Sequence, residues 1–135
     1  MALRNTFGKD ERLKREQHIE TLFRSGKAFS VFPLRLIWRA VPRAAGERFP
    51  VRAGFSVPKK KFRKAVSRNR IKRLLREAWR LQKGGLYAAL PPDTQLHLFL
   101  IFTDTKEPDL PAVQATLAQV IVRLQKAVAP VTPDA

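Results

Sequence analysis

One short stretch of the chain decides most of its fold. Residues 66–79 read Val-Ser-Arg-Asn-Arg-Ile-Lys-Arg-Leu-Leu-Arg-Glu-Ala-Trp. If the stretch is helical, its apolar members fall within about 100° of arc, the width of a stripe that faces a core. These members are Ile71, Leu74, Leu75 and Ala78. The rest of the circumference is basic. We therefore predict an amphipathic helix over residues 66–82, ended by Gly84 and Gly85.

The positive charge of the whole chain is concentrated around this helix. The 135 residues include 27 Lys+Arg and 11 Asp+Glu, for a net charge of +16. Residues 59–80 hold eleven basic side chains against Glu77 alone, whereas residues 81–135 are close to neutral. Solvated helix faces usually alternate in sign because like charges at i, i+4 repel each other. The run therefore indicates a polyanionic partner. A hydrophobic content of 44% excludes a disordered basic tail.

The remaining elements follow from periodicity and from Gly and Pro positions. We expect a helix over residues 10–25, strands over 31–41 and 50–57, a buried central strand over 95–103 and a last helix over 112–128. Together they predict one α+β domain over residues 1–129, in the order α-β-β-α-β-α around a mixed central sheet. The pattern leaves room for a further short edge strand, and residues 130–135 should form a flexible tail.

The first two strands each have one apolar face and one polar face. Leu34, Leu36 and Trp38 alternate with Arg35, Ile37 and Arg39, and Arg52, Gly54 and Ser56 occupy the equivalent polar face of the next strand. A sheet floor with arginines, and with a glycine that permits close approach, suits a strand of nucleotides. A merely solvated sheet face is the alternative interpretation.

A phosphodiester backbone fits the basic helix better than a membrane surface does. Arginine forks bind phosphate bidentately, and the narrow apolar stripe is needed for the core. Asn69 adds a donor and an acceptor among the arginines, so a base, a 2′-hydroxyl or a metal-bound water is a candidate ligand there.

Several kinds of chemistry are excluded or disfavoured. The chain has no cysteine, which rules out disulfides, thiolate metal sites and cysteine nucleophiles. Its carboxylates are scattered, and His97, in the buried strand, is interpreted as a core histidine with satisfied hydrogen bonds. We expect no catalytic residue in the protein. No signal sequence or membrane-length apolar run occurs, so we expect a cytoplasmic protein with no membrane partner.

The region from Phe55 to Trp79 resembles the protein subunits of bacterial ribonuclease P. The resemblance is carried by Ser56-Val57 and Lys59-Lys60 at the strand end, then by the triplet Arg68-Asn69-Arg70 and by Lys72-Arg73. Residues 13–26, with Leu22-Phe23 and the closing Gly26, are similar to the first helix of that family, and the resemblance covers residues 7–128.

The resemblance implies a fold and a function. The fold would contain a left-handed β-α-β crossover through the basic helix. The protein would bind a catalytic RNA and the 5′ leader of precursor tRNA, and the RNA would remove that leader by Mg²⁺-dependent hydrolysis of one phosphodiester. The implied partners are the catalytic RNA and precursor tRNA, with no protein partner. Mg²⁺ would act at the RNA active site, and any metal site on the protein would lie near Asn69.

The resemblance also implies which residues contact RNA. Those facing the catalytic RNA are Arg68, Asn69, Arg70, Lys72, Arg73 and Arg76. For the leader cleft it implies Ile19, Phe23, Ser56, Lys59 and Lys60, and the polar strand face described above adds Arg35 and Arg52. Two positions depart from the family pattern. Ile19 replaces an aromatic residue and offers no base stacking, and residues 61–64 replace a glycine-containing link.

Two other functions stay open from the sequence alone. One is a ribosomal or general RNA-binding protein without a catalytic partner. The other is a DNA-binding module, which would need a helix free to enter the major groove, whereas half of this helix is committed to the core.

Overall fold

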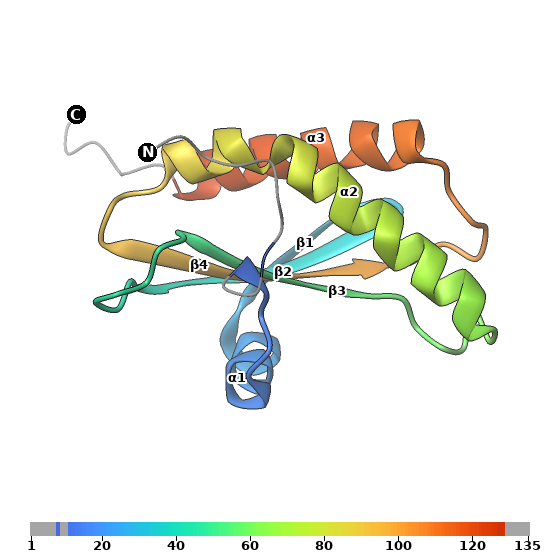
Figure 1. Ribbon diagram of the computed structural model, residues 1–135, viewed down its shortest axis with the longest axis horizontal. Coiled ribbons are helices and arrows are strands. Elements are labelled where there is room, and N and C mark those ends of the chain that lie inside the picture. Colours follow the sequence, from blue (N-terminus) through green and yellow to red (C-terminus); the bar gives the residue numbers. More distant parts are fainter. Residues whose placement is uncertain (1–7, 9–10, 129–135) are drawn as a thin grey trace.

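A four-stranded sheet lies between two helices on one face and a single helix on the other (Figure 1). The computed structural model describes residue 8 and residues 11–128. Its elements are α1 (Glu16–Ser25), β1 (Lys27–Val31), β2 (Leu34–Pro42), β3 (Val51–Ser56), α2 (Ala65–Ala89), β4 (Thr94–Phe102) and α3 (Leu110–Val128). The expected α+β class with a mixed sheet is confirmed.

The sheet has the strand order β1-β2-β4-β3. The β1–β2 and β2–β4 pairs are antiparallel, and β3 and β4 are parallel. Because parallel neighbours need a crossover connection, α2 returns the chain from the end of β3 to the start of β4. The nearly continuous apolar run of β4 is explained by its place between β2 and β3, as expected for a strand covered on both faces.

Two separate apolar clusters hold the layers together. The main core lies between the sheet and helices α2 and α3, and includes Leu36, Ile71, Trp79, Leu98 and Leu117. The second cluster is much smaller. It consists of Leu13, Leu22 and Ile37, with Ile19, Phe99 and Ile101 packed against it, and attaches α1 to the opposite face of the sheet.

Three boundaries differ from the sequence prediction by more than two residues: the start of α1, the start of β2, which is Leu34 rather than residue 31, and the end of α2. Helix α1 begins at Glu16 rather than at residue 10, because residues 11–13 run beside β3, where Leu13 N–H donates to the Ala53 carbonyl (3.0 Å). Residues 9 and 10 lie outside the described residues. The additional edge strand exists as β1, paired with β2. Helix α2 continues to Ala89 through Gly84 and Gly85.

The extension of α2 has a packing reason. Lys83, Leu86 and Tyr87 are buried and continue the inward-facing stripe beyond the two glycines. Glycine disfavours a helix by only about 1 kcal/mol relative to alanine, which this burial outweighs. The expected tail at residues 130–135 lies outside the described residues. None of the helices in the described part of the chain is long and apolar enough to cross a membrane.

Candidate nucleic-acid interface

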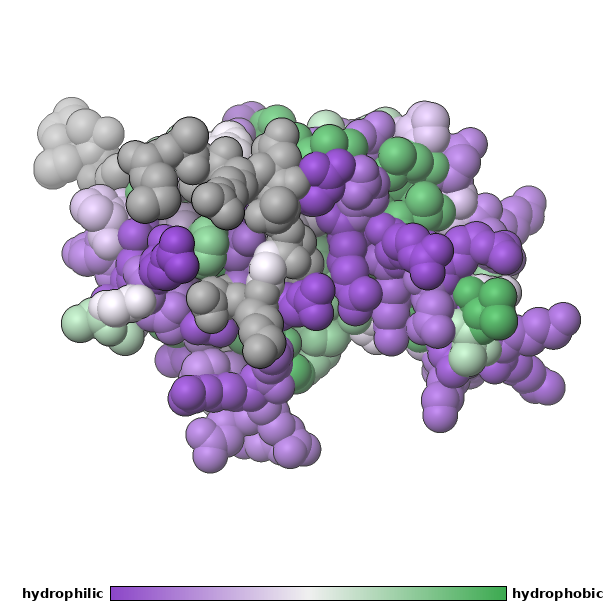
Figure 2. Space-filling model, viewed as in Figure 1, coloured by the Kyte–Doolittle hydropathy of each residue, from purple (hydrophilic) through white to green (hydrophobic). Residues whose placement is uncertain are grey.

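The solvent-facing side of α2 carries most of the predicted basic residues. Asn69, Arg70, Arg73 and Arg76 are exposed and Lys72 is half-buried, whereas Ile71, Leu75 and Ala78 are in the core. Figure 2 shows hydrophilic side chains along α2 and around the connection that precedes it. Arg70 pairs with Glu107 (3.0 Å), but both side chains are exposed, and such pairs contribute little to stability. The helix therefore presents a basic surface to solvent.

Arg68 has a different environment from its neighbours on this helix. Its Nη1 donates to the carbonyls of Phe62 (2.9 Å) and Arg63 (2.8 Å). The guanidinium is therefore bound to the backbone of the connection before α2. The sequence placed Arg68 at the flank of the apolar stripe and among the RNA contacts, and the structure adds its hydrogen bonds to the preceding backbone, which periodicity does not reveal.

The connection between β3 and α2 is anchored at two points. Phe62 is buried, with its ring 6.0 Å from that of Phe102, and Lys61 Nζ donates to the Thr103 carbonyl (2.8 Å). Lys59 and Lys60 are exposed on the turn ahead of these anchors. The residues that replace the glycine-containing link thus fix the path of the backbone and leave the lysine pair projecting beside α2.

The sheet face toward α1 is organised in rows by the strand register. Arg39, His97 and Arg52 lie in one row across β2, β4 and β3. The next row holds Ile37, Phe99 and Gly54, and the third holds Arg35, Ile101 and Ser56. The expected basic face therefore exists, with an apolar middle row on which α1 packs.

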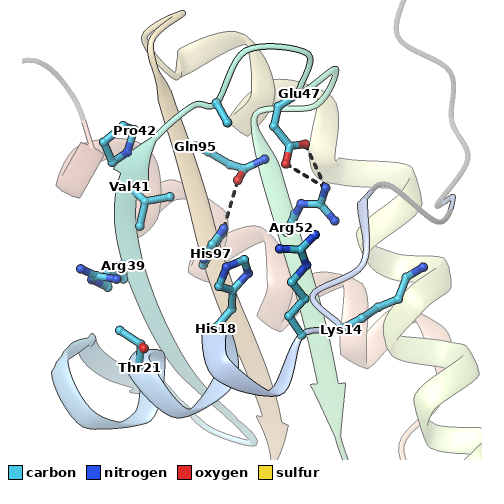
Figure 3. Close-up of a pocket in the computed structure, with 12 residues that line it drawn as sticks. Lys14, His18, Thr21, Arg39, Val41, Pro42, Glu47, Arg52, Gln95 and His97 are labelled. Carbon is cyan, nitrogen blue, oxygen red and sulfur yellow. Dashed lines mark hydrogen bonds and ion pairs between the residues drawn. The ribbon is translucent and has the colours of Figure 1, made fainter.

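A cleft of about 650 Å³ lies between α1 and the basic row (Figure 3). Lys14, Arg15 and His18 line it from the helix side, and Arg39, Arg52 and His97 line it from the sheet. Arg52 is held by Glu47 through two hydrogen bonds of 2.9 Å, and its Nη1 also approaches the Arg12 carbonyl (3.4 Å). One carboxylate among four cations leaves the cleft strongly positive, which suits a phosphate-bearing ligand.

His97 was interpreted from the sequence as a satisfied core histidine, and the structure shows it buried and hydrogen-bonded but also lining the cleft. It is only 6% exposed and its Nε2 is 3.0 Å from Gln95 Oε1. Burial, with His18, Arg52 and Arg39 nearby, lowers the pKa of His97 to about 4. The rings of His18 and His97 are 4.9 Å apart. Sequence reasoning missed both histidines as members of the site, although His97 alternates along β4 with the core leucines.

Phe23 and Phe99 form the aromatic part of this face. Phe23 is 50% exposed on α1, and its ring lies 5.4 Å from that of Phe99 on β4. A Cβ at Gly54 would lie 2.7 Å from the Phe99 ring. The close approach that Gly54 permits is therefore that of Phe99, whereas the sequence suggested a nucleotide. Phe99 itself was not among the predicted site residues.

The other predicted cleft residues have mixed environments. Ile19 is half-buried against the second apolar cluster, so it helps to attach α1. Arg35 is exposed and Ser56 half-buried in the third row. Of the predicted cleft residues only Arg52 lines the cleft, whose lining does not include Ile19, Phe23, Arg35, Ser56, Lys59 or Lys60. The structure therefore brings Arg52 together with Arg39 and the two histidines, and leaves the lysine pair beside α2.

A buried polar cluster anchors the segment that leads into α1. Glu11 Oε2 accepts hydrogen bonds from Lys83 Nζ and from the Tyr87 hydroxyl (2.6 Å). Burial and the neighbouring Glu11 carboxylate raise the pKa of Tyr87. From this anchor the chain passes the outer edge of β3 to reach α1 on the opposite face. Nothing in the sequence separated Lys83 from the exposed lysines.

A smaller hollow of about 220 Å³ at the β3 edge joins the two basic surfaces. It is lined by Arg12 and Lys14 from the segment before α1, by Arg76 from α2, and by Gly54 and Phe99 from the sheet. Lys14 also lines the main cleft, and Figure 3 shows its side chain extending toward α2. The described residues contain no group of three His, Asp or Glu side chains placed to hold a metal ion.

The fold and these two joined surfaces define a small basic α+β protein of the nucleic-acid-binding class. A family model described as Ribonuclease P matches residues 7–125. The chain belongs to the ribonuclease P protein family and has the role of a tRNA-processing subunit.

The relatives support this membership along most of the chain. The ribonuclease P protein component of Porphyromonas gingivalis strain ATCC 33277 is 41% identical over 125 residues, which is 88% of each chain. That of Chlorobium phaeobacteroides is 43% identical over 84 residues, covering 62% of this chain and 58% of the relative.

Solved structures show the same fold. The ribonuclease P protein of Thermotoga maritima aligns with a TM-score of 0.65 at 24% identity, over 84% of this chain and 96% of that one. The Staphylococcus aureus protein aligns with a TM-score of 0.64 at 21% identity, over 87% and 97%.

Proposed function

We propose that this protein binds two RNAs at once. Helix α2 binds the catalytic RNA of ribonuclease P, and the cleft beneath α1 binds the 5′ leader of precursor tRNA. The RNA subunit hydrolyses the phosphodiester that joins leader and tRNA, with Mg²⁺ bound on the RNA, and the complex works in the cytoplasm. The exposed arginines of α2 and the Arg39–His97–Arg52 row face different sides of the molecule, and this arrangement carries the proposal.

The protein's contribution in this proposal is binding and orientation. Exposed arginines such as Arg73 neutralise phosphates, which favours association most at low salt. The cleft supplies cations, and the Phe23–Phe99 pair lies outside its lining on the same side of the sheet. Cations and aromatic rings on one face suit a single strand whose bases stack on the rings.

The test is reconstitution with a bacterial ribonuclease P RNA and precursor tRNA at low Mg²⁺. We expect the protein to increase leader removal and to bind precursor tRNA more tightly when the leader is longer. If the protein binds RNA generally but changes neither cleavage nor leader dependence, the alternative of a general or ribosomal RNA-binding protein is correct instead. Lys126→Ala, on the last turn of α3, is a matched control. It removes an exposed cation that belongs to neither of the two proposed binding surfaces.

A further inference from the structure

The side chains that line the α1 cleft offer many hydrogen-bond donors and few acceptors. Lys14, Arg15, Arg39 and Arg52 only donate hydrogen bonds. Both carboxylate oxygens of Glu47 already accept from Arg52, and Thr21 donates its hydroxyl to the Gln17 carbonyl of its own helix (2.9 Å). A phosphate needs only donors. Any accepting atom that faces the cleft would therefore select a second, different group on the ligand.

His97 supplies such an acceptor, and its neighbours set the tautomer. Gln95 Nε2 donates to the Phe49 carbonyl (3.2 Å), which turns Gln95 Oε1 toward His97 Nε2 (3.0 Å). Nε2 must therefore carry the ring proton, since an oxygen only accepts. With the pKa of His97 lowered to about 4 by burial and the adjacent cations, the ring is neutral near pH 7 and Nδ1 keeps a lone pair.

Nδ1 of His97 is the candidate acceptor, on a side chain that borders the cleft and is only 6% exposed. His97 lines the cleft, and Nδ1 has no hydrogen-bond partner in the described part of the chain. Figure 3 shows the His97 and His18 rings together at the centre of the cleft, with Arg39 to one side and Arg52 to the other.

The position of this acceptor indicates which ligand group it meets. His97 lies between Arg39 and Arg52 in one row of the sheet, and neighbouring strands are about 4.8 Å apart. A group bound to Nδ1 therefore lies next to whatever the guanidiniums bind. In a ribonucleotide the 2′-hydroxyl is the donor adjacent to the phosphate, and it is the group that distinguishes RNA from DNA.

We propose that the cleft holds one ribonucleotide of the leader, with Arg15 and Arg39 on its phosphate and His97 Nδ1 accepting a hydrogen bond from its 2′-hydroxyl. This inference rests on the proposed leader-binding function and adds to it a residue that selects ribose. His18 lies against the His97 ring from α1 and restricts the space beside Nδ1.

The experiment measures binding of precursor tRNA to the reconstituted holoenzyme. The leader is either all-ribose or carries single 2′-deoxy substitutions at successive positions. We expect one position at which the deoxy substitution weakens binding about two- to tenfold, the range for one neutral hydrogen bond. His97→Leu should abolish this penalty. His97→Asn, whose side-chain carbonyl can occupy the place of Nδ1, should retain most of it.

The outcomes separate this inference from the proposed function. If binding does not depend on the presence of a leader, the leader-binding function is wrong. If the leader contributes but the deoxy penalty is the same with His97→Leu, the contact belongs to another group and the inference is overturned. The inference is also overturned if the His97-dependent loss of binding appears when an amino group is removed from a leader base rather than when the 2′-hydroxyl is removed. Thermal unfolding of each variant, followed by circular dichroism, checks that the variants remain folded. If His97→Leu does not fold, the test rests on whether His97→Asn retains the penalty of the 2′-deoxy substitution.

Discussion

Glu11 and Lys83 form an almost completely buried ion pair, with side chains 1% and 2% exposed, although they lie 72 residues apart in the sequence. The pair joins the segment before α1 to the last turns of α2, and Tyr87 donates a further hydrogen bond to the same carboxylate oxygen. The entry of the chain into the α1 layer is therefore set by a polar contact inside the main body of the protein.

Breaking this pair from one side should be strongly destabilising. Lys83→Met leaves the Glu11 carboxylate buried without its cation, and the loss of one partner of a buried pair costs about 3–5 kcal/mol. The double variant Glu11→Gln with Lys83→Met removes both charges and should recover a large part of that loss. Urea unfolding at pH 7 measures both free energies. Equal destabilisation in the single and double variants would show that the charge pairing is unimportant.

His97 should make stability depend on mild acid. Its pKa in the folded protein is lowered to about 4 by burial and by His18, Arg52 and Arg39, with Glu47 opposing them. The unfolded chain binds the proton near its ordinary pKa of about 6.5. The free energy of unfolding should therefore be greatest above that pH and fall as the pH drops toward 4, by up to about 1.4 kcal/mol per unit.

Urea unfolding between pH 7 and pH 4.5 tests this dependence, with His97→Gln as the non-titrating comparison. The difference in unfolding free energy between the two proteins should change across this range. A constant difference would mean that His97 does not carry the effect.

Arg73 and Arg68 should give different phenotypes although they share a helix. Arg73 is exposed, so Arg73→Ala should reduce affinity for the catalytic RNA and flatten the plot of log affinity against log salt by about 0.7–0.9. Arg68 is bound to the carbonyls of Phe62 and Arg63, so Arg68→Ala should also lower the melting temperature. Salt titrations of binding, with melting curves, separate the two. A melting temperature for Arg68→Ala as high as that of Arg73→Ala would contradict the structural role.

Phe23→Ala should weaken binding of precursor tRNA more than binding of mature tRNA. Its ring is half exposed against Phe99, and base stacking on an aromatic ring contributes about 1–3 kcal/mol. Affinities of the holoenzyme for the two RNAs, compared with those of Phe23→Leu, measure the contribution of the ring. Equal losses for the two RNAs would assign Phe23 to packing alone.

The parts of the fold that follow repeating patterns were predictable. The apolar stripe of α2 with Ile71 and Leu75 is buried, and in the apolar run of β4 three residues are buried while Phe99 and Ile101 are half-buried. The predicted end of α2 was wrong because Leu86 and Tyr87 continue to pack into the core beyond the two glycines. Local sequence periodicity does not reveal such long-range contacts. Strand β1 is short, and its pattern of mostly exposed residues gives little signal.

The candidate site was predictable only in its charge. Alternation along the strands placed Arg39 and Arg52 on one face, and the structure confirms that face. The roles of Arg68, Gly54 and Phe99 depend on neighbours remote in sequence. Lys83 was missed for the same reason, since a buried lysine is recognised only when its carboxylate partner is known.

The two apolar clusters also give the protein two levels of local stability. The main core unites the sheet with α2 and α3, whereas α1 is attached through the small cluster around Leu13, Leu22 and Ile37. Segments with little buried apolar surface open with lower free energies than the whole domain, as native-state hydrogen exchange shows for other proteins. Amide protons of α1 should therefore exchange before those of β4. An RNA strand held between α1 and the sheet would slow that exchange, which makes the helix a reporter of cleft occupancy.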